Sequence, residues 1–339
     1  MKALLLDSFI LGYIFFVGLI KVINPGEDNL LGDVYTYLLY FLILAIVGGV
    51  LSKVLNHYKI KTLGEAIFEA PHKKIAASTK SWVKTFWGIQ LIVAFIITVM
   101  VGSILTEFSL RELLDEDGIG GAQKIFSSLI NPNFKILPQG ILAIIETIYI
   151  AFMATIIAIP MAFLLAFLSA KNIMGGSKIG FSIYMLLRTL LNITRSIEPL
   201  IWAIIFSVWV GIGPFAGMLA LMLHSVASLT KQYSEIIECV NEGPIEGIQA
   251  TGGNAIQVIW FAIVPQIILP YISFTIYRWD INVRMATIIG LVGGGGIGTM
   301  LVQYQGQALW NEVGTLAFLI VIAVWTMDTA SAYIREAIK

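Results

Sequence analysis

Charged residues are scarce in this chain of 339 residues, in which Asp, Glu, Lys and Arg together make up only 12%. Hydrophobic residues account for 58%, and the mean hydropathy is +0.87. A soluble domain could not bury so many apolar side chains, so this composition excludes a soluble fold and favours a protein embedded in lipid. The formal net charge of zero indicates nothing about partners by itself.

Reactive side chains are equally few. Cys239 is the only cysteine, which permits no internal disulfide and fits a reduced compartment. His224 stands alone on an apolar run, with no second histidine or carboxylate three or four residues away, which favours a packed or pore-lining residue over a metal ligand. The sequence shows no Ser-His-Asp set, metal-ligand cluster or candidate cysteine nucleophile. We therefore predict no catalytic site, no metal site and no enzyme activity in this chain.

Long apolar runs dominate instead. A hydrocarbon slab about 30 Å thick is crossed by roughly 20 apolar helical residues, and about eight runs reach this length, which predicts an all-α, polytopic bundle of transmembrane helices. The first run is too long for a signal peptide and lacks a small-residue cleavage pattern, so we interpret it as a retained span. The predicted spans are residues 4–23, 35–54, 86–108, 141–170, 179–212, 215–233, 256–291 and 315–334.

The loops between these spans differ in charge. The segment after the second span is rich in lysine, which predicts a cytoplasmic location, and its aromatic residues fit lipid headgroups better than nucleic acid. The segments on either side of it in sequence are acidic and are predicted to be external. Alternation then places both termini and residues 235–254 in the cytoplasm. The basic residues are Lys53, Lys59, Lys61, Lys73, Lys74, Lys80 and Lys84, and the first acidic segment holds Glu27, Asp28 and Asp33.

The chain is predicted to divide near residue 137. Residues 1–107 form an N-terminal extension of three spans, to whose first two spans the sequence assigns no role. Residues 108–138 form an external linker, in which 131–133 (Asn-Pro-Asn) is typical of a turn. Residues 139–339 hold five spans and nearly all the polar residues within spans, so we expect the function to reside there.

One polar stretch, residues 242–254, interrupts the apolar C-terminal part. Pro244 suits the first turn of a helix, where its missing N–H costs no hydrogen bond. Gly252 suits a helix end, because glycine accepts left-handed geometry, and Asn254 with Gln257 matches a capping box that starts a second helix. The pattern predicts a short surface helix of about eight residues, or about 12 Å.

The spacing in this stretch resembles the docking signature of inner-membrane permeases of ATP-binding-cassette importers: Glu-Ala-Ala, three residues, Gly, nine residues, Ile, any residue, Leu-Pro. Glu246, Gly252 and Pro265 fall in register, while apolar residues or glycine replace the alanines, the Ile and the Leu. The wider resemblance covers most of residues 130–339 and is closest to the phosphonate and phosphate type of permease. It is carried by residues 131–134, 146–147, 170–172, 188–192, 195–198, 211–217, 277–284 and 290–298.

The resemblance implies a five-helix, MetI-like permease core that forms the translocation pathway of an importer in the bacterial inner membrane. A separate cytoplasmic ATPase, which binds the ATP and Mg²⁺, would dock on the surface helix, and an external substrate-binding protein would deliver the substrate. This chain would hold no cofactor and would act as a homodimer or with a related permease. The implied ATPase-docking residues are Pro244, Ile245, Glu246, Ile248, Gln249 and Gly252.

Four arginines lie within long apolar runs, where each costs at least about 2.5 kcal/mol at mid-membrane. One interpretation is a cationic path for a small oxyanion, because the guanidinium fork suits phosphoryl oxygens. The other is that the arginines pair with Glu146, Glu198 and Asp280 to fix helix packing, which we favour for Arg188. The predicted substrate-pathway residues are Arg195, Arg278, Asp280, Arg284, Gly293 and Gly295.

The glycine run at 293–298 satisfies the pattern G-x-G-x-x-G. A dinucleotide site needs this pattern between a strand and a helix, whereas the surroundings here are membrane helix. Thr299 also stands where a nucleotide P-loop requires lysine. We interpret the run as a flexible break whose backbone lines the pathway.

We therefore predict a permease subunit that imports a phosphonate- or phosphate-type oxyanion and does not itself catalyse a reaction. One alternative is a secondary transporter or channel driven by an ion gradient, with Asp280 and Arg284 as an ion relay. Another is a membrane transferase that acts on lipid-linked phosphate. A co-purifying ATPase that is lost when Glu246 is altered favours the importer, and ATP-independent uptake that an uncoupler abolishes favours the secondary transporter.

Overall fold

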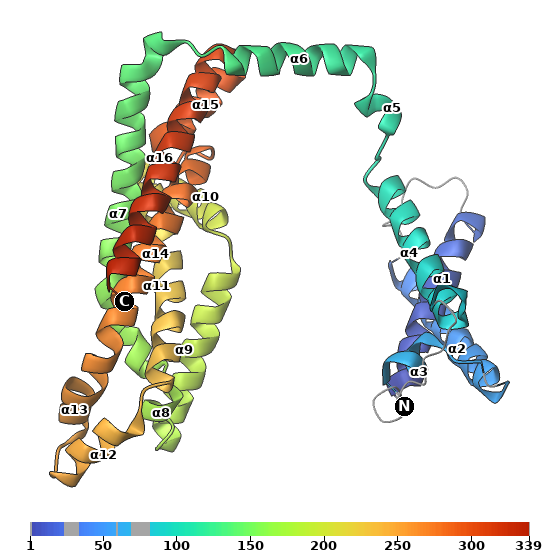
Figure 1. Ribbon diagram of the computed structural model, residues 1–339, viewed down its shortest axis with the longest axis horizontal. Helices are drawn as coiled ribbons and strands as arrows, with labels where there is room; N and C mark the ends of the chain where they lie inside the picture. The colour runs from blue at the N-terminus through green and yellow to red at the C-terminus, as the bar shows by residue number, and fades with distance from the viewer. Residues whose placement is uncertain (1, 24–33, 59, 69–81, 339) are drawn as a thin grey trace. The chain divides into compact units, whose positions relative to one another are not determined.

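The computed structural model describes residues 2–23, 34–58, 60–68 and 82–338. The chain divides into two compact units, Met1–Ile119 and Gly120–Lys339, and each is described by itself. The described residues form helices joined by turns, with no strand among them, which confirms the all-α prediction. The helices are labelled in Figure 1.

The N-terminal unit is held together by a buried carboxylate. Asp7 on α1 accepts hydrogen bonds from Ser52 Oγ (2.9 Å), Thr62 Oγ1 (2.5 Å) and Gly64 N (2.7 Å). Because these donors lie on or beside α2 and α3, Asp7 ties three segments together. The unit comprises α1 (Lys2–Ile23), α2 (Val34–His57), α3 (Leu63–Phe68), η1 (Trp82–Lys84), α4 (Phe86–Leu105) and α5 (Leu110–Leu113).

Part of the orientation prediction falls on residues that the structure does not describe. The side chains concerned are those of Lys59, Lys73, Lys74 and Lys80 in the basic loop and of Glu27, Asp28 and Asp33 in the first acidic segment. The assignment of loops and termini to the two sides of the membrane therefore stays a prediction.

The C-terminal unit is built around three long helices that pack against one another: α7 (Leu137–Leu168), α11 (Pro214–Glu238) and α14 (Val264–Gly290). α16 (Trp310–Ile338) packs on α7 and α14, while α9 (Lys178–Ser196) and α10 (Pro199–Val210) pack on α11. The shorter elements are α6 (Glu116–Ile130), which runs across the boundary between the units, η2 (Phe134–Ile136), α8 (Lys171–Met174), α12 (Glu242–Ala250), α13 (Ala255–Val258), the π-helical η3 (Ile259–Ile263) and α15 (Gly296–Gly306). In Figure 1, α8 and α12 lie at one end of this unit, and α7 and α16 begin at the opposite end.

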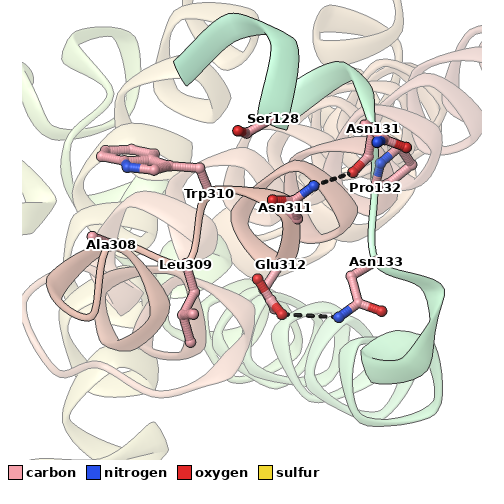
Figure 2. Close-up of a pocket in the computed structure, with 9 residues that line it drawn as sticks. All are labelled: Ser128, Asn131, Pro132, Asn133, Ala308, Leu309, Trp310, Asn311 and Glu312. Carbon is pink, nitrogen blue, oxygen red and sulfur yellow. Dashed lines mark hydrogen bonds between the residues drawn. The ribbon is translucent and has the colours of Figure 1, made fainter. Parts of the chain in front are cut away.

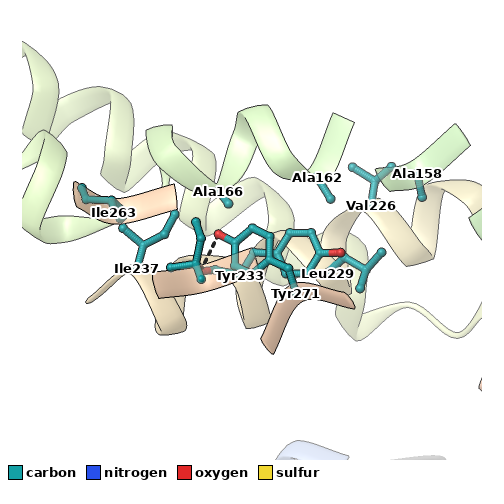
Figure 3. Packing of buried hydrophobic residues seen from close by; sticks show 11 residues of the cluster. Ala158, Ala162, Ala166, Val226, Leu229, Tyr233, Ile237, Ile263 and Tyr271 are labelled. Atoms are coloured by element: carbon teal, nitrogen blue, oxygen red, sulfur yellow. Dashed lines mark hydrogen bonds between the residues drawn. The ribbon is translucent and has the colours of Figure 1, made fainter. Parts of the chain in front are cut away.

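Small residues allow the three central helices to approach closely. α7 places fully buried alanines every fourth residue, including Ala158, Ala162 and Ala166, and these face α11 and α14 (Figure 3). In the same cluster the rings of Tyr233 and Tyr271 stack with their centroids 3.8 Å apart, and the Tyr271 hydroxyl donates to the Tyr233 carbonyl oxygen (3.0 Å). Close backbone approach over small residues is how helices associate in lipid.

The prediction of eight spans is not confirmed. In the described part of the chain, five helical segments are long and apolar enough to cross a membrane, and α9 with α10 makes a sixth if this pair, bent by 91°, is counted as one span. The bend lies at Glu198 and Pro199, where Pro199 starts α10. α11 is absent from this set, although it is 25 residues long and central in the bundle. Its buried face carries polar residues such as Ser225 and Thr230, which lower its hydropathy. The five segments are Thr36–His57, Phe86–Ile104, Phe134–Leu168, Ala255–Gly290 and Trp310–Ile338.

Candidate functional site: a capped surface helix and a polar cluster in the bundle

The predicted surface helix is present as α12, which lies between α11 and α13. It begins at Glu242, slightly before the expected start, because Asn241 is its N-cap. Pro244 therefore lies within the first turn, as its chemistry predicts. A carboxylate at the first helical position also interacts favourably with the positive end of the helix dipole.

The end of α12 is fixed by two backbone hydrogen bonds. Gly252, with φ +81°, donates from its N–H to the Gln249 carbonyl oxygen (2.9 Å), and Gly253 N donates to the Ile248 carbonyl oxygen (3.1 Å). This pair of bonds is typical of helices that end in a left-handed glycine. The capping box predicted for the start of α13 is also present. α12 is thus a rigid segment with a defined start and a defined end.

The two faces of α12 differ in exposure. Ile245 packs against the buried cluster around Tyr233, and Ile248 is half-buried against Gly253. The opposite face is open, and none of the nine residues of α12 is fully buried. Of the predicted docking residues, two therefore anchor the helix, and the others are exposed on its surface: Pro244, Glu246, Gln249 and Gly252.

Polar contacts hold the segment that leads from α11 into α12. The Gln266 side chain on α14 accepts from Asn241 N (3.0 Å) and donates to the Asn241 carbonyl oxygen (3.4 Å). Glu238, the last residue of α11, accepts from the backbone N–H of Lys171 (2.9 Å) and from the Arg188 guanidinium (2.9 Å). The N-cap of α12 is thus bonded to α14, and the end of α11, three residues before it, is bonded to α8 and α9.

Sequence reasoning missed Glu238 and Gln266, although it placed Arg188 in an ion pair. The Arg188 pair is confirmed, but the acid is Glu238 and not one of the three acids that the sequence suggested. The sequence pointed to these two residues only through their positions. Glu238 lies just before the α12 stretch, and Gln266 directly follows Pro265 of the docking signature. Spacing alone does not reveal which distant side chain completes such a contact.

Arg284 is neutralised by two acids. Its Nη2 lies 2.7 Å from Asp280 Oδ2 and 3.1 Å from Asp328 Oδ1 on α16. The Asp280 side chain is 4% exposed, whereas those of Arg284 and Asp328 are 46% exposed. Arg284 between two carboxylates fixes α14 to α16 and has its positive charge already paired.

Arg278 has no such partner. It is 8% exposed, and its only hydrogen bond in the described part of the chain runs from Nε to Ser225 Oγ (3.2 Å). Asn282, one turn further along α14, donates to Ser225 Oγ (2.8 Å) and to Thr155 Oγ1 (2.9 Å). Arg195 is exposed at the end of α9, in no ion pair with a described acid. The predicted pathway arginines thus differ sharply in environment.

Residues 162–339, more than half of the chain, match the family described as "Binding-protein-dependent transport system inner membrane component". The matched region contains α12, the arginines discussed above and the glycine run. The chain belongs to this family. It is a multi-pass permease component of an ATP-binding-cassette importer, as the docking stretch predicted.

The permease is similar to several transport permeases. It is 33% identical over 223 residues, covering 66% of this chain and 80% of the relative, to the phosphite transport system permease protein PtxC of Stutzerimonas stutzeri. It is 29% identical over 213 residues, covering 62% of this chain and 39% of the relative, to the phosphate-import permease protein PhnE of Mycolicibacterium smegmatis. A solved structure of the MetNI methionine ABC transporter in an inward-facing conformation matches with a TM-score of 0.50 and 22% identity, covering 59% of the permease and 95% of that chain. This likeness shows the fold.

The glycine run of the permease forms a tight turn between α14 and α15. Ile297 N donates to Thr147 Oγ1 on α7 (2.9 Å), and Gly294 packs against Gly217 on α11. Of the two predicted pathway glycines, Gly295 is buried against Pro214, and Gly293 is half-buried beside Ile212. The residues sequence reasoning treated as a flexible break are, in this subunit, closely packed.

A polar pocket of about 430 Å³ lies where α7 and α16 begin, at the end of the unit opposite α12 in Figure 1, and Figure 2 shows its lining residues. Asn311 Nδ2 donates to the Asn131 carbonyl oxygen (2.7 Å), and Asn133 Nδ2 donates to Glu312 Oε1 (2.9 Å). These bonds join the segment before α7 to the start of α16. The pocket is lined by Ser128, Asn131, Pro132, Asn133, Ala308, Leu309, Trp310, Asn311 and Glu312.

Proposed function

We propose that the permease imports a phosphorus oxyanion, namely phosphite, phosphate or a phosphonate, and that it does so with energy from a separate cytoplasmic ATPase. The observation that carries the proposal is α12, an exposed helix that ends at a left-handed glycine. Its N-cap residue Asn241 is bonded to Gln266 on α14, and Glu238 at the end of α11 is bonded to α8 and α9. An ATPase that moves α12 therefore also moves the transmembrane helices to which these residues are bonded. The substrate class is supported by the names of the relatives, the phosphite transport system permease protein PtxC and the phosphate-import permease protein PhnE.

The ATPase binds and hydrolyses the ATP in this proposal, and the permease contributes the pathway. Because the chain has one docking helix, two copies form the pathway, and each engages one subunit of an ATPase dimer. Closure of the ATPase dimer draws the two docked helices together and changes the side on which the cavity opens. An external binding protein delivers the substrate to the end opposite α12, which carries the polar pocket, and α12 faces the cytoplasm of a bacterium.

A single substitution on the open face of α12 tests the docking step. A Cβ atom added at Gly247 meets nothing within 4 Å, so Gly247→Arg leaves the fold intact and places a bulky side chain on the docking face. We expect the amount of ATPase that co-purifies with the tagged permease to fall by about tenfold or more, equivalent to about 1.4 kcal/mol of binding free energy. ATP-dependent uptake falls in parallel.

The matched control is Gly306→Arg, because Gly306 has equally open surroundings at the far end of α15. This variant should retain wild-type amounts of ATPase. Normal ATPase recovery with Gly247→Arg would exclude α12 as the docking site. Uptake that requires an ion gradient and persists without ATP would instead favour a secondary transporter.

A further inference from the structure

Arg278 is a buried cation without a counterion. It lies near the middle of α14, is 8% exposed, and forms no ion pair with any acid in the described part of the chain. Its Nε donates to Ser225 Oγ, but neither terminal guanidinium nitrogen has a protein partner among the described residues. An arginine at mid-membrane costs at least about 2.5 kcal/mol, so an unpaired one points to an anion that is supplied from elsewhere.

The hydrogen bonds around Arg278 have a defined direction. The Thr155 hydroxyl donates to the Ala151 carbonyl oxygen (2.7 Å), so its oxygen must accept from Asn282 Nδ2 (2.9 Å). Ser225 Oγ accepts from both Asn282 (2.8 Å) and Arg278 (3.2 Å), which leaves the Ser225 hydroxyl proton without an acceptor. The cluster therefore contains uncommitted donors, and one uncommitted acceptor in the buried Asn282 Oδ1, beside a positive charge.

These residues come from three helices and lie at the same depth. Thr155, Ser225 and Arg278 are each near the middle of their helix, on α7, α11 and α14 respectively. His224 lies within electrostatic range of both Arg278 and Arg195, and its Nδ1 is buried without a partner in the described residues. Donors and a cation thus converge at the centre of the bundle, on α7, α11 and α14.

We propose that Arg278, Ser225 and Asn282 form a mid-membrane binding site for the transported oxyanion. The inference rests on the proposed function and adds the place where the substrate binds within the permease. The planar guanidinium fork of Arg278 binds two oxygens of a tetrahedral oxyanion, and the Ser225 hydroxyl donates to a third. Asn282 positions Ser225. The trio at Arg284 is excluded as this site, because its two carboxylates already neutralise the arginine.

The decisive variant is Asn282→Asp. The change is isosteric and places a carboxylate one helical turn from Arg278, the same spacing as that of the Asp280–Arg284 pair. The new carboxylate pairs with the Arg278 guanidinium and competes with the substrate for it. We therefore expect the affinity for inorganic phosphate to fall about tenfold or more. The measurement is equilibrium dialysis of radiolabelled phosphate against the purified permease–ATPase complex without the binding protein. The amount of assembled permease–ATPase complex is measured for each variant by gel filtration.

Two further variants complete the test. Arg278→Lys keeps the charge but loses the fork, and should also weaken phosphate binding about tenfold. Arg335→Ala is the control. It removes a cation of α16 whose Cζ lies 5.2 Å from the ring centroid of Tyr277, the residue before Arg278 in sequence, and the variant should bind phosphate like the wild type. Wild-type affinity in Asn282→Asp or Arg278→Lys, or no phosphate binding by the wild-type complex, overturns the site. Failure of the importer assignment appears separately, as a lack of ATP-dependent uptake by the wild type in proteoliposomes with its binding protein.

Discussion

Gly298→Ala is expected to leave little folded permease, although it adds only one methyl group. Gly298, in the first turn of α15, faces Gly290 at the end of α14, and an added Cβ atom would lie 2.8 Å from Gly290 Cα and still closer to the Thr287 carbonyl oxygen. Both neighbours are backbone atoms, so no side chain can rotate away. Overpacking of this kind typically costs about 1–3 kcal/mol and more where the backbone cannot shift, and we expect about 3 kcal/mol or more here.

The backbone around Gly298 is held by further contacts. Ile297 N is bonded to Thr147 on α7, and the Thr299 hydroxyl donates to the Gly290 carbonyl oxygen (3.0 Å). α15 therefore cannot move away without breaking these bonds. The measurement is the yield of monodisperse permease in detergent and its melting temperature.

Gly306→Ala serves as the comparison, because it lies on the same helix and its added Cβ atom meets nothing within 4 Å. Its yield and melting temperature should equal those of the wild type. If Gly298→Ala has the same melting temperature as the wild type, the close contact between α14 and α15 does not exist in the folded permease.

The glycine run also shows a limit of sequence reasoning. The sequence placed the run among helices, and it does lie between α14 and α15. It could not show that Gly294 packs on Gly217 or that Ile297 bonds to Thr147, since these partners are distant in the chain. The number of glycines therefore suggested flexibility where the tertiary structure requires close packing.

Helix ends were predicted well because their chemistry is local. The proline at the start of α12, the left-handed glycine at its end and the capping box of α13 each depend on residues within one turn. The arginine partners were predicted less well. The Asp280–Arg284 pair is four residues apart and visible in sequence, whereas Glu238 and Asp328 reach Arg188 and Arg284 from other helices.

Arg284→Ala is the second substitution with a large expected effect, and we expect it to act on stability. It removes the partner of Asp280 Oδ2, and Asp280 Oδ1 is already buried without a partner in the described residues. Removal of one member of a buried ion pair costs about 3–5 kcal/mol. Because Arg284 is 46% exposed, we expect the lower end, about 3 kcal/mol. The check is the melting temperature of the purified permease, together with its rate of uptake.

A double variant separates packing from transport. Asp280→Asn in the Arg284→Ala background removes the stranded carboxylate, so most of the lost stability should return. Uptake should return with it, because Arg284 is already paired with Asp280 and Asp328 and offers an oxyanion no free cation. If stability returns while uptake stays low, Asp280 and Arg284 act in the pathway itself, as the sequence first suggested. Since Arg278 keeps its charge in every one of these variants, phosphate binding at the mid-membrane cluster should stay constant throughout the series.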